Sequence, residues 1–146
     1  MKAAIMGYGT IGSGVAKVLD TNRDIIKARL GEELELKYIL DLRDFPGDPH
    51  EDCFVKDYKK IAQDEEVQIV VETMGGVEPA FTFVKEMLEA GKSVTTSNKA
   101  LVADKGAELM EIADKHGVNF VFEAAVWLLF SSNRSPSYPR RCREFQ

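Results

Sequence analysis

Three glycines near the start of the chain have the spacing of a phosphate-binding loop. Residues 7–12 read GYGTIG and directly follow the short apolar run of residues 2–6. In the pattern G-x-G-x-x-G, the first glycine permits a tight turn, the second lets the backbone approach a pyrophosphate, and the third lets a helix pack closely on a strand. A tight turn without a ligand is the alternative, but the position between a strand and a helix favours dinucleotide binding. The candidate cofactor-binding residues of this loop are Gly7, Gly9, Thr10, Ile11 and Gly12.

A second candidate for chemistry is Lys99. It follows Ser97 and Asn98, just after the predicted strand of residues 93–96. An ammonium group there could contact the nicotinamide side of a cofactor and the substrate oxygen that gains or loses a proton. The alternative is a surface lysine near the start of a helix, where the helix dipole disfavours a positive charge, so the functional interpretation is preferred. Ser97, Asn98 and Lys99 are therefore candidates for cofactor binding, and Lys99 is also the candidate catalytic residue.

Two residues at the end of the second predicted strand bear on the choice between NAD and NADP. Asp41 could accept hydrogen bonds from a ribose diol, which favours NAD, whereas Arg43 could hold a 2′-phosphate, which favours NADP. Alternation along a strand puts both on the same side, so periodicity leaves the choice open. A carboxylate about 4 Å from that phosphate would repel it by about 4 kcal/mol per unit charge at an effective dielectric of about 20, so both side chains cannot point at it. We favour NADP, with Arg43 as the phosphate ligand.

Strands and helices alternate along the chain and must position these residues. Short apolar or alternating runs predict strands at residues 2–6, 34–40, 67–71, 93–96 and 118–122. Helical spacing predicts a first helix from Ile11 whose core face carries Ile11, Val15, Val18 and Leu19. Further helices are predicted from residues 78–79 to Gly91 and from about residue 102 to residue 117.

This order of elements indicates right-handed βαβ units. It predicts an α/β fold, a doubly wound parallel sheet of Rossmann type. The candidates all follow strands at the carboxyl edge, where such sheets bind their ligands. Gly75, which with Gly76 follows the third predicted strand, is a further cofactor-binding candidate because glycine permits close approach of the backbone.

Composition argues against several other classes of protein. The chain has 146 residues, the size of one domain, and its formal net charge of −5 argues against a nucleic-acid or anionic-membrane partner. No apolar run reaches the ~20 residues of a membrane-spanning helix. The apolar N-terminal run is too short for a signal peptide, so we expect a cytoplasmic protein. The oligomeric state is left open.

Three further segments resemble those of homoserine dehydrogenases. They are residues 72–76 (ETMGG), 96–103 (TSNKALVA) and 122–126 (FEAAV), and together with GYGTIG they have the family's order and spacing over residues 1–126. The resemblance implies an enzyme that interconverts L-aspartate 4-semialdehyde and L-homoserine with NAD(P)H, in threonine and methionine biosynthesis. It also implies that Lys99 lies in the active site, and that Glu123 and the backbone at Val126 help to hold a monovalent cation such as Na⁺. From the residues alone, Glu72 and Glu123 could equally make loop hydrogen bonds.

The resemblance ends after Val126. Family members continue with a glycine-rich turn, a proline and a long substrate-binding and dimerisation domain, whereas this chain continues with WLLF and a Ser/Pro/Arg-rich stretch. We therefore expect a domain of residues 1–126 and a disordered tail of residues 127–146. The tail is interpreted either as a short basic extension or as out-of-frame translation after a frameshift near codon 126. Because the family's acid–base groups and most substrate contacts belong to the following domain, we expect the chain alone to bind cofactor but to turn over substrate very slowly or not at all.

Two other function classes remain as alternatives. A non-catalytic dinucleotide-binding module, or a fragment, would carry the same loops without the downstream domain. A Rossmann-like methyltransferase also has a glycine loop after its first strand. The full spacing of GYGTIG and the Asn98–Lys99 pair argue against the methyltransferase.

Overall fold

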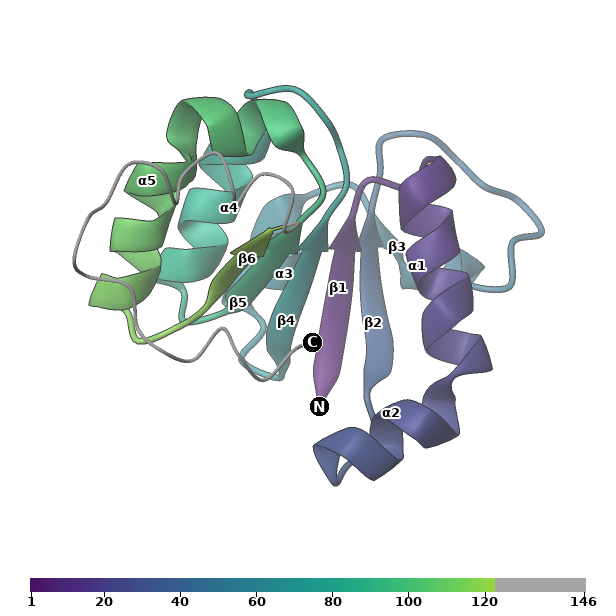
Figure 1. Ribbon diagram of the computed structural model, residues 1–146. Coiled ribbons are helices and arrows are strands. Elements are labelled where there is room, and N and C mark those ends of the chain that lie inside the picture. The colour runs from purple at the N-terminus through teal and green to yellow at the C-terminus, as the bar shows by residue number, and fades with distance from the viewer. Residues whose placement is uncertain (123–146) are drawn as a thin grey trace.

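A six-stranded parallel sheet organises the computed structural model, which describes residues 1–122 (Figure 1). The strand order is β3-β2-β1-β4-β5-β6, and every pair of neighbours is parallel. The doubly wound α/β fold is therefore confirmed. The strands are β1 (Lys2–Met6), β2 (Glu35–Leu40), β3 (Phe54–Val55), β4 (Val67–Glu72), β5 (Ser93–Thr96) and β6 (Phe120–Phe122).

Helices lie on both faces of the sheet, with α1 on one side and α4 and α5 on the other (Figure 1). Within residues 1–122, none of them combines the length and apolar character needed to cross a bilayer. The helices are α1 (Thr10–Thr21), α2 (Arg23–Leu30), α3 (Tyr58–Gln63), α4 (Ala80–Glu89) and α5 (Lys99–Lys115), with a short 3-10 helix η1 (Glu51–Cys53).

The strand order reverses at β1. This strand pairs with β2 on one side and with β4 on the other. The chain therefore builds outward through β2 and β3 first, and from β4 it builds in the opposite direction through β5 and β6. In doubly wound sheets, ligands bind at the carboxyl edge where the strand order reverses in this way.

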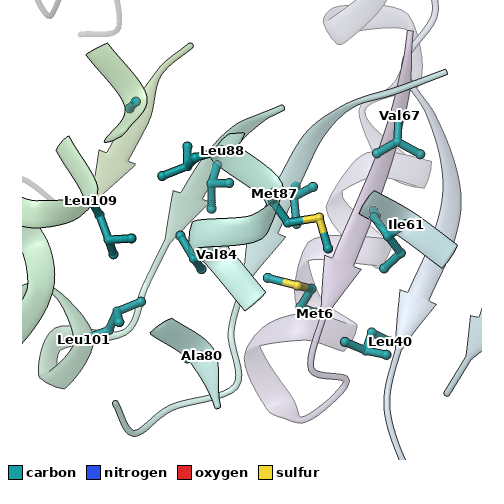
Figure 2. Close-up of a cluster of buried hydrophobic side chains, with 14 of the residues drawn as sticks. Met6, Leu40, Ile61, Val67, Ala80, Val84, Met87, Leu88, Leu101 and Leu109 are labelled. Atoms are coloured by element: carbon teal, nitrogen blue, oxygen red, sulfur yellow. The ribbon is translucent and has the colours of Figure 1, made fainter. Parts of the chain in front are cut away.

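Side chains of β1 alternate between two apolar cores, one on each face of the sheet. Ala4 and Met6 belong to the larger core, together with residues of α3, α4 and α5 (Figure 2). Ile5 belongs to the smaller core, together with Ile39 of β2 and Ala16 of α1. Because both faces are covered, β1 is apolar at nearly every position, as a buried parallel strand should be.

Most predicted elements are confirmed, with shifts at their ends. β1 and β5 have the predicted bounds, and α4 ends just before Gly91, whose φ is +82°. The predicted start of α5 at about residue 102 is wrong. This helix begins at Lys99 because the Asn98 side chain caps it, accepting a hydrogen bond from the Leu101 amide at 3.1 Å. The helices α2 and α3 and the two-residue β3 are additions that the sequence patterns do not predict.

The predicted core face of α1 is confirmed at Val15, which packs against the smaller core, and is wrong at Ile11 and Val18. Ile11 and Val18 are 56% and 55% exposed, whereas the buried residues of the helix are Gly12 and Ala16. At Gly12 and Ala16 only small side chains fit between this helix and the sheet, because the helix starts directly against the turn that follows β1. Larger apolar residues are therefore placed on the flank of the helix.

Strand β2 contains a pairing irregularity that its alternating sequence does not reveal. Ala3 pairs with Leu36 and Ala4 pairs with Tyr38, so the register shifts at Lys37. Leu36 consequently packs against the smaller core and Tyr38 against the larger one. The alternation alone predicts that these two side chains share a face.

The contact at Gly12 generates a stability prediction. A Cβ at this position would lie 1.9 Å from the carbonyl oxygen of Gly7, so Gly12→Ala forces α1 away from β1. We expect the free energy of unfolding to fall by about 1–3 kcal/mol. The matched control is Gly14→Ala in the same helix, where an added Cβ meets nothing within 4 Å. That change should be neutral or stabilising by up to about 1 kcal/mol, and urea denaturation followed by circular dichroism measures both. Equal effects of the two changes would contradict the prediction.

Candidate functional site

Three loops meet at the carboxyl edge of the sheet. They are the glycine loop (residues 7–9) between β1 and α1, the TMGG loop (residues 73–76) after β4, and residues 97–98 between β5 and α5. Because the strands are parallel, all three loops leave the sheet at the same edge. The sequence candidates found at this edge, or in the loop after β2, are Gly7, Gly9, Thr10, Ile11, Gly12, Arg43, Gly75, Ser97, Asn98 and Lys99.

The glycine loop turns sharply and brings α1 against β1. Gly7 has a φ of +95°, in the left-handed region that favours glycine, and its amide donates to the Leu40 carbonyl at 2.8 Å. The close approach of Gly12 to the Gly7 carbonyl explains the third glycine of the pattern. A Cβ on Gly9 would meet nothing within 4 Å, so the space next to the second glycine is open to a ligand.

The N-terminus of α1 offers amides to an anion. Gly9 is the N-cap residue, no side chain caps this end, and the first turn holds no acidic residue. Amides of a first helical turn have no acceptor within the helix, and this end of the helix dipole is positive. The backbone of Thr10 and Ile11 therefore suits a phosphate group, whereas the exposed side chain of Ile11 takes no part in this fit.

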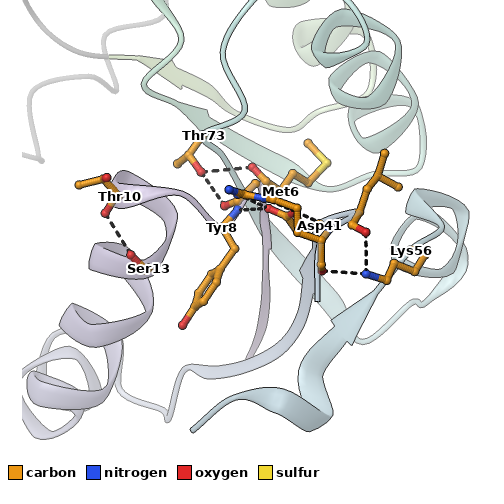
Figure 3. A network of polar contacts seen from close by, with 10 residues as sticks. Met6, Tyr8, Thr10, Ser13, Asp41, Lys56 and Thr73 are labelled. Atoms are coloured by element: carbon orange, nitrogen blue, oxygen red, sulfur yellow. Dashed lines mark hydrogen bonds and ion pairs between the residues drawn. The ribbon is translucent and has the colours of Figure 1, made fainter. Parts of the chain in front are cut away.

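Asp41 and Arg43 bind one another through three hydrogen bonds. Arg43 donates from Nε to Oδ1 at 3.0 Å and from Nη2 to Oδ2 at 2.9 Å, and its own amide also donates to Oδ1 at 2.9 Å. Asp41 Oδ2 additionally accepts a hydrogen bond from the Tyr8 amide at 2.8 Å, which fixes the glycine loop (Figure 3). The Arg43 guanidinium is the main reason that the pKa of the Asp41 carboxyl lies far below its usual value. The carboxylate is thus already neutralised by its neighbour.

The loop after β2 is also held by Lys56. Its Nζ donates to the carbonyls of Leu42 at 2.8 Å and Arg43 at 2.7 Å, and it pairs with Asp44 at 2.9 Å. The two contacts with carbonyl groups, drawn as dashed lines at Lys56 in Figure 3, hold the backbone at Leu42 and Arg43. Lys56 therefore positions the Arg43 segment.

Hydrogen bonds connect the TMGG loop to the glycine loop. The Thr73 amide donates to the Met6 carbonyl at 2.9 Å, and its hydroxyl donates to the Gly7 carbonyl at 2.8 Å (Figure 3). Gly75 and Gly76 have φ values of +83° and +73°, so this loop uses a backbone conformation that favours glycine. The two loops on either side of the β1–β4 switch point are therefore tied together.

A buried polar network lies under the end of β4. Glu72 is 0% exposed, and its Oε1 accepts from the Met74 amide at 2.7 Å while its Oε2 accepts from the Thr96 hydroxyl. The Thr96 oxygen accepts from the Asn98 amide at 2.9 Å. Asn98 Nδ2 in turn donates to the Gly76 carbonyl at 2.6 Å. Glu72 therefore makes loop hydrogen bonds, as the sequence analysis allowed.

Lys99 occupies the first position of α5. Its side chain is exposed, and it makes no hydrogen bond or ion pair within residues 1–122 that would occupy its ammonium group. The Asn98 cap beside it links α5 to the TMGG loop. Lys99 is consequently next to the loops that would face the nicotinamide end of a dinucleotide bound across the switch point.

The cation ligands implied by the resemblance, Glu123 and Val126, lie outside the described residues, as does the tail of residues 127–146. In residues 1–122, no group of three or more histidine, cysteine, aspartate or glutamate side chains is placed to hold a metal ion.

Three residues that hold this site together, Tyr8, Thr73 and Thr96, were missed in the sequence analysis. Tyr8 packs edge-on against Phe45 and Phe54, with ring centroids 5.1 and 4.9 Å away. Burial, together with the hydrogen bond to Asp48, raises the pKa of the Tyr8 hydroxyl to about 12. Their positions in the sequence could have indicated these roles, because Tyr8 lies between two motif glycines, Thr73 directly follows β4 and Thr96 ends β5.

The uncapped helix N-terminus, the glycine turn and the switch point together define a dinucleotide-binding domain of Rossmann type. The family model described as "Homoserine dehydrogenase, NAD binding domain" matches residues 7–123. The chain belongs to this family.

Relatives and solved structures agree with this assignment. The homoserine dehydrogenase of Lactococcus lactis subsp. lactis is 38% identical over 129 residues, which cover 84% of this chain and 30% of the relative. A crystal structure of S. aureus homoserine dehydrogenase at pH 8.5 has a TM-score of 0.78 and 34% identity, covering 86% of this chain and 32% of that one. A hyperthermophilic archaeal homoserine dehydrogenase mutant in complex with NADPH has a TM-score of 0.68 and 26% identity, covering 85% of this chain and 44% of that one. The chain thus spans about a third of the length of the relatives it matches.

The Asp41–Arg43 pair generates a prediction about pH. Because the folded-state pKa of Asp41 is lowered, the pair stabilises the fold fully above the ordinary aspartate pKa of about 3.9, and this contribution is lost as the pH falls through the lowered value. Arg43→Ala removes the main cause of the shift. The difference in Tm between wild type and Arg43→Ala should therefore be larger at about pH 7 than at about pH 3.

The control for this experiment is Arg23→Ala. Arg23 pairs with Asp20 at 3.5 Å in an exposed position, so its removal should change Tm little at either pH. A Tm difference for Arg43→Ala that is the same at both pH values would contradict the prediction. Thermal unfolding followed by circular dichroism supplies both measurements.

Proposed function

We propose that the protein binds NADP(H) across the β1–β4 switch point and is the cofactor-binding part of a homoserine dehydrogenase. The observation that carries this proposal is the glycine loop, where Gly12 packs against Gly7 and the uncapped start of α1 faces open space beside Gly9. A pyrophosphate fits such a helix end. Family membership supports the same cofactor class, and so does the NADPH bound to the similar archaeal enzyme.

The preference for NADP rests on the Asp41–Arg43 pair. A free aspartate would repel a 2′-phosphate. Here Arg43 neutralises the Asp41 carboxylate, which also accepts a hydrogen bond from the Tyr8 amide. The Arg43 side chain is 63% exposed, and its Nη1 makes no hydrogen bond within residues 1–122. Arg43 can therefore bind a 2′-phosphate while it keeps Asp41 neutralised, which removes the electrostatic objection to NADP.

For the reaction, we propose that the enzyme interconverts L-aspartate 4-semialdehyde and L-homoserine, as a cytoplasmic enzyme of small-molecule metabolism. The cofactor would supply or accept the hydride. Lys99 lies where its ammonium group could contact the nicotinamide side and the substrate oxygen that gains or loses a proton. A monovalent cation held by Glu123 and the backbone of Val126 remains part of this proposal.

The second candidate function is cofactor binding without turnover. It is favoured by the extent of the match, because the chain spans 30% of the Lactococcus lactis relative. A hydride-transfer site must hold both reactants in alignment, and loss of that alignment removes several kcal/mol of barrier reduction. The two candidates differ in activity and agree on cofactor binding.

The role of Arg43 can be tested by cofactor titration. We expect Arg43→Ala to weaken NADPH binding about tenfold while NADH binding changes little, because one charged hydrogen-bonding group to the 2′-phosphate is lost. Lys59→Ala is the matched control, since Lys59 is exposed and forms no side-chain contact in residues 1–122 that bears on this loop. Isothermal titration calorimetry gives the affinities of wild type and of both variants for NADPH and NADH. An unchanged NADPH-to-NADH ratio in Arg43→Ala would contradict the NADP assignment.

The activity of the chain can be tested directly. We expect the purified 146-residue chain to bind NADPH but to give no homoserine-dependent reduction of NADP or NAD above background. Binding is measured by NADPH fluorescence, and turnover by absorbance of the reduced nicotinamide. Clear turnover would overturn the second candidate, and absence of NADPH binding would overturn the proposed function itself.

A further inference from the structure

Glu72 is a buried carboxylate without an ionic partner. It is 0% exposed, and no ion pair formed within residues 1–122 includes it. A carboxylate in such a place is costly unless it is hydrogen-bonded, and an apolar side chain of similar size would pack there without this cost. The residue type therefore points to something other than packing.

The two oxygens of Glu72 hold two different loops. Oε1 accepts from the Met74 amide in the TMGG loop at 2.7 Å, and Oε2 accepts from the hydroxyl of Thr96 at the end of β5. The Thr96 oxygen also accepts a hydrogen bond from the Asn98 amide, and Asn98 Nδ2 donates to the Gly76 carbonyl in the TMGG loop. The hydrogen bonds thus form a closed ring from β4 through β5 and back to the same loop.

This ring includes the N-cap of α5. Asn98 Oδ1 accepts from the Leu101 amide at 3.1 Å, and Lys99 is the first residue of the helix. The glycine loop has a separate attachment, because Thr73 ties it to the start of the TMGG loop at Gly7 and Asp41 ties it to the end of β2. The half of the site around Lys99 is therefore held by Glu72, and the half around the phosphates is held by other bonds.

We propose that Glu72 is a positioning residue that sets the TMGG loop against Lys99 and so shapes the subsite for the nicotinamide half of the cofactor. The inference rests on the proposed function, because it assumes that a dinucleotide binds across the switch point. Glu72 acts through Met74, Thr96 and Asn98 and does not itself contact the reacting atoms.

Two substitutions open the ring with little change in volume. Glu72→Gln leaves only one acceptor oxygen, so the Met74 amide or the Thr96 hydroxyl loses its acceptor. Thr96→Val removes the hydroxyl that joins Glu72 to the Asn98 amide. The matched control is Glu86→Gln, because Glu86 also accepts a hydroxyl hydrogen bond, from Tyr58 at 2.8 Å, but joins α4 to α3.

The experiment compares NADPH with 2′,5′-ADP, which has the adenosine and phosphate groups but no nicotinamide. Affinities of both are measured by calorimetry on the full 146-residue chain. We expect Glu72→Gln and Thr96→Val to weaken NADPH binding about fivefold, the equivalent of roughly one hydrogen bond, and to leave 2′,5′-ADP binding within about twofold. Glu86→Gln should leave both affinities unchanged.

The other outcomes distinguish failure of the proposed function from failure of the inference about Glu72. A wild-type chain that binds neither ligand overturns the proposed function, and the inference with it. The inference alone is overturned if the wild-type chain binds NADPH and 2′,5′-ADP, and Glu72→Gln and Thr96→Val either weaken the binding of the two ligands equally or leave the binding of both ligands unchanged. Equal weakening identifies a general structural role for Glu72. Faster hydrogen exchange in Glu72→Gln at the Met74 amide or at the Asn98 amide, which bonds to Thr96, is the expected direct sign that the ring has opened, and unchanged exchange at both amides also counts against it.

Discussion

The arrangement of the site depends on one close contact, between the first turn of α1 and the turn that follows β1. Gly12 lies so near the Gly7 carbonyl that no side chain can stand between them. Because of this contact, α1 begins directly at the end of the central strand, with its positive end at the carboxyl edge. The same proximity explains why Ala16 is buried while Val18 is exposed. A helix set further from the sheet could bury larger side chains, but its amides would move away from the switch point.

Around this contact, hydrogen bonds fix the spacing of the loops. A site that must receive a ligand between its loops cannot be filled with apolar side chains, so packing alone cannot hold it open. Asp41 holds the glycine loop from β2, Thr73 holds it from β4, and Glu72 extends the connection to β5. The larger apolar core reaches the ends of β1 and β2 at Met6 and Leu40 (Figure 2). The loops at this edge are therefore held from below by the core and sideways by hydrogen bonds.

Much of the fold and part of the site were predictable from the sequence, and the reasons for success and failure are physical. Buried parallel strands such as β1 and β5 are short apolar or alternating runs, and a glycine after α4 marks its end. Periodicity fails where geometry interrupts it, as at Lys37 in β2, or where an element is as short as β3. The close approach at Gly12 was predictable because the glycine motif has a fixed spacing. The links through Thr73 and Thr96 were missed, because a single hydrogen bond between distant residues leaves no periodic trace.

The central place of β1 has a consequence for how the protein is made. This strand comprises residues 2–6 and is synthesised before the other described strands, yet its second neighbour, β4, ends only at Glu72. Until that part of the chain has been synthesised, the β1–β2 pair has an open inner edge and apolar side chains on both faces. Such an edge can pair with other unfolded chains. The nascent chain is therefore exposed to such pairing until β4 is made, and the arrival of β4 covers the open edge of β1.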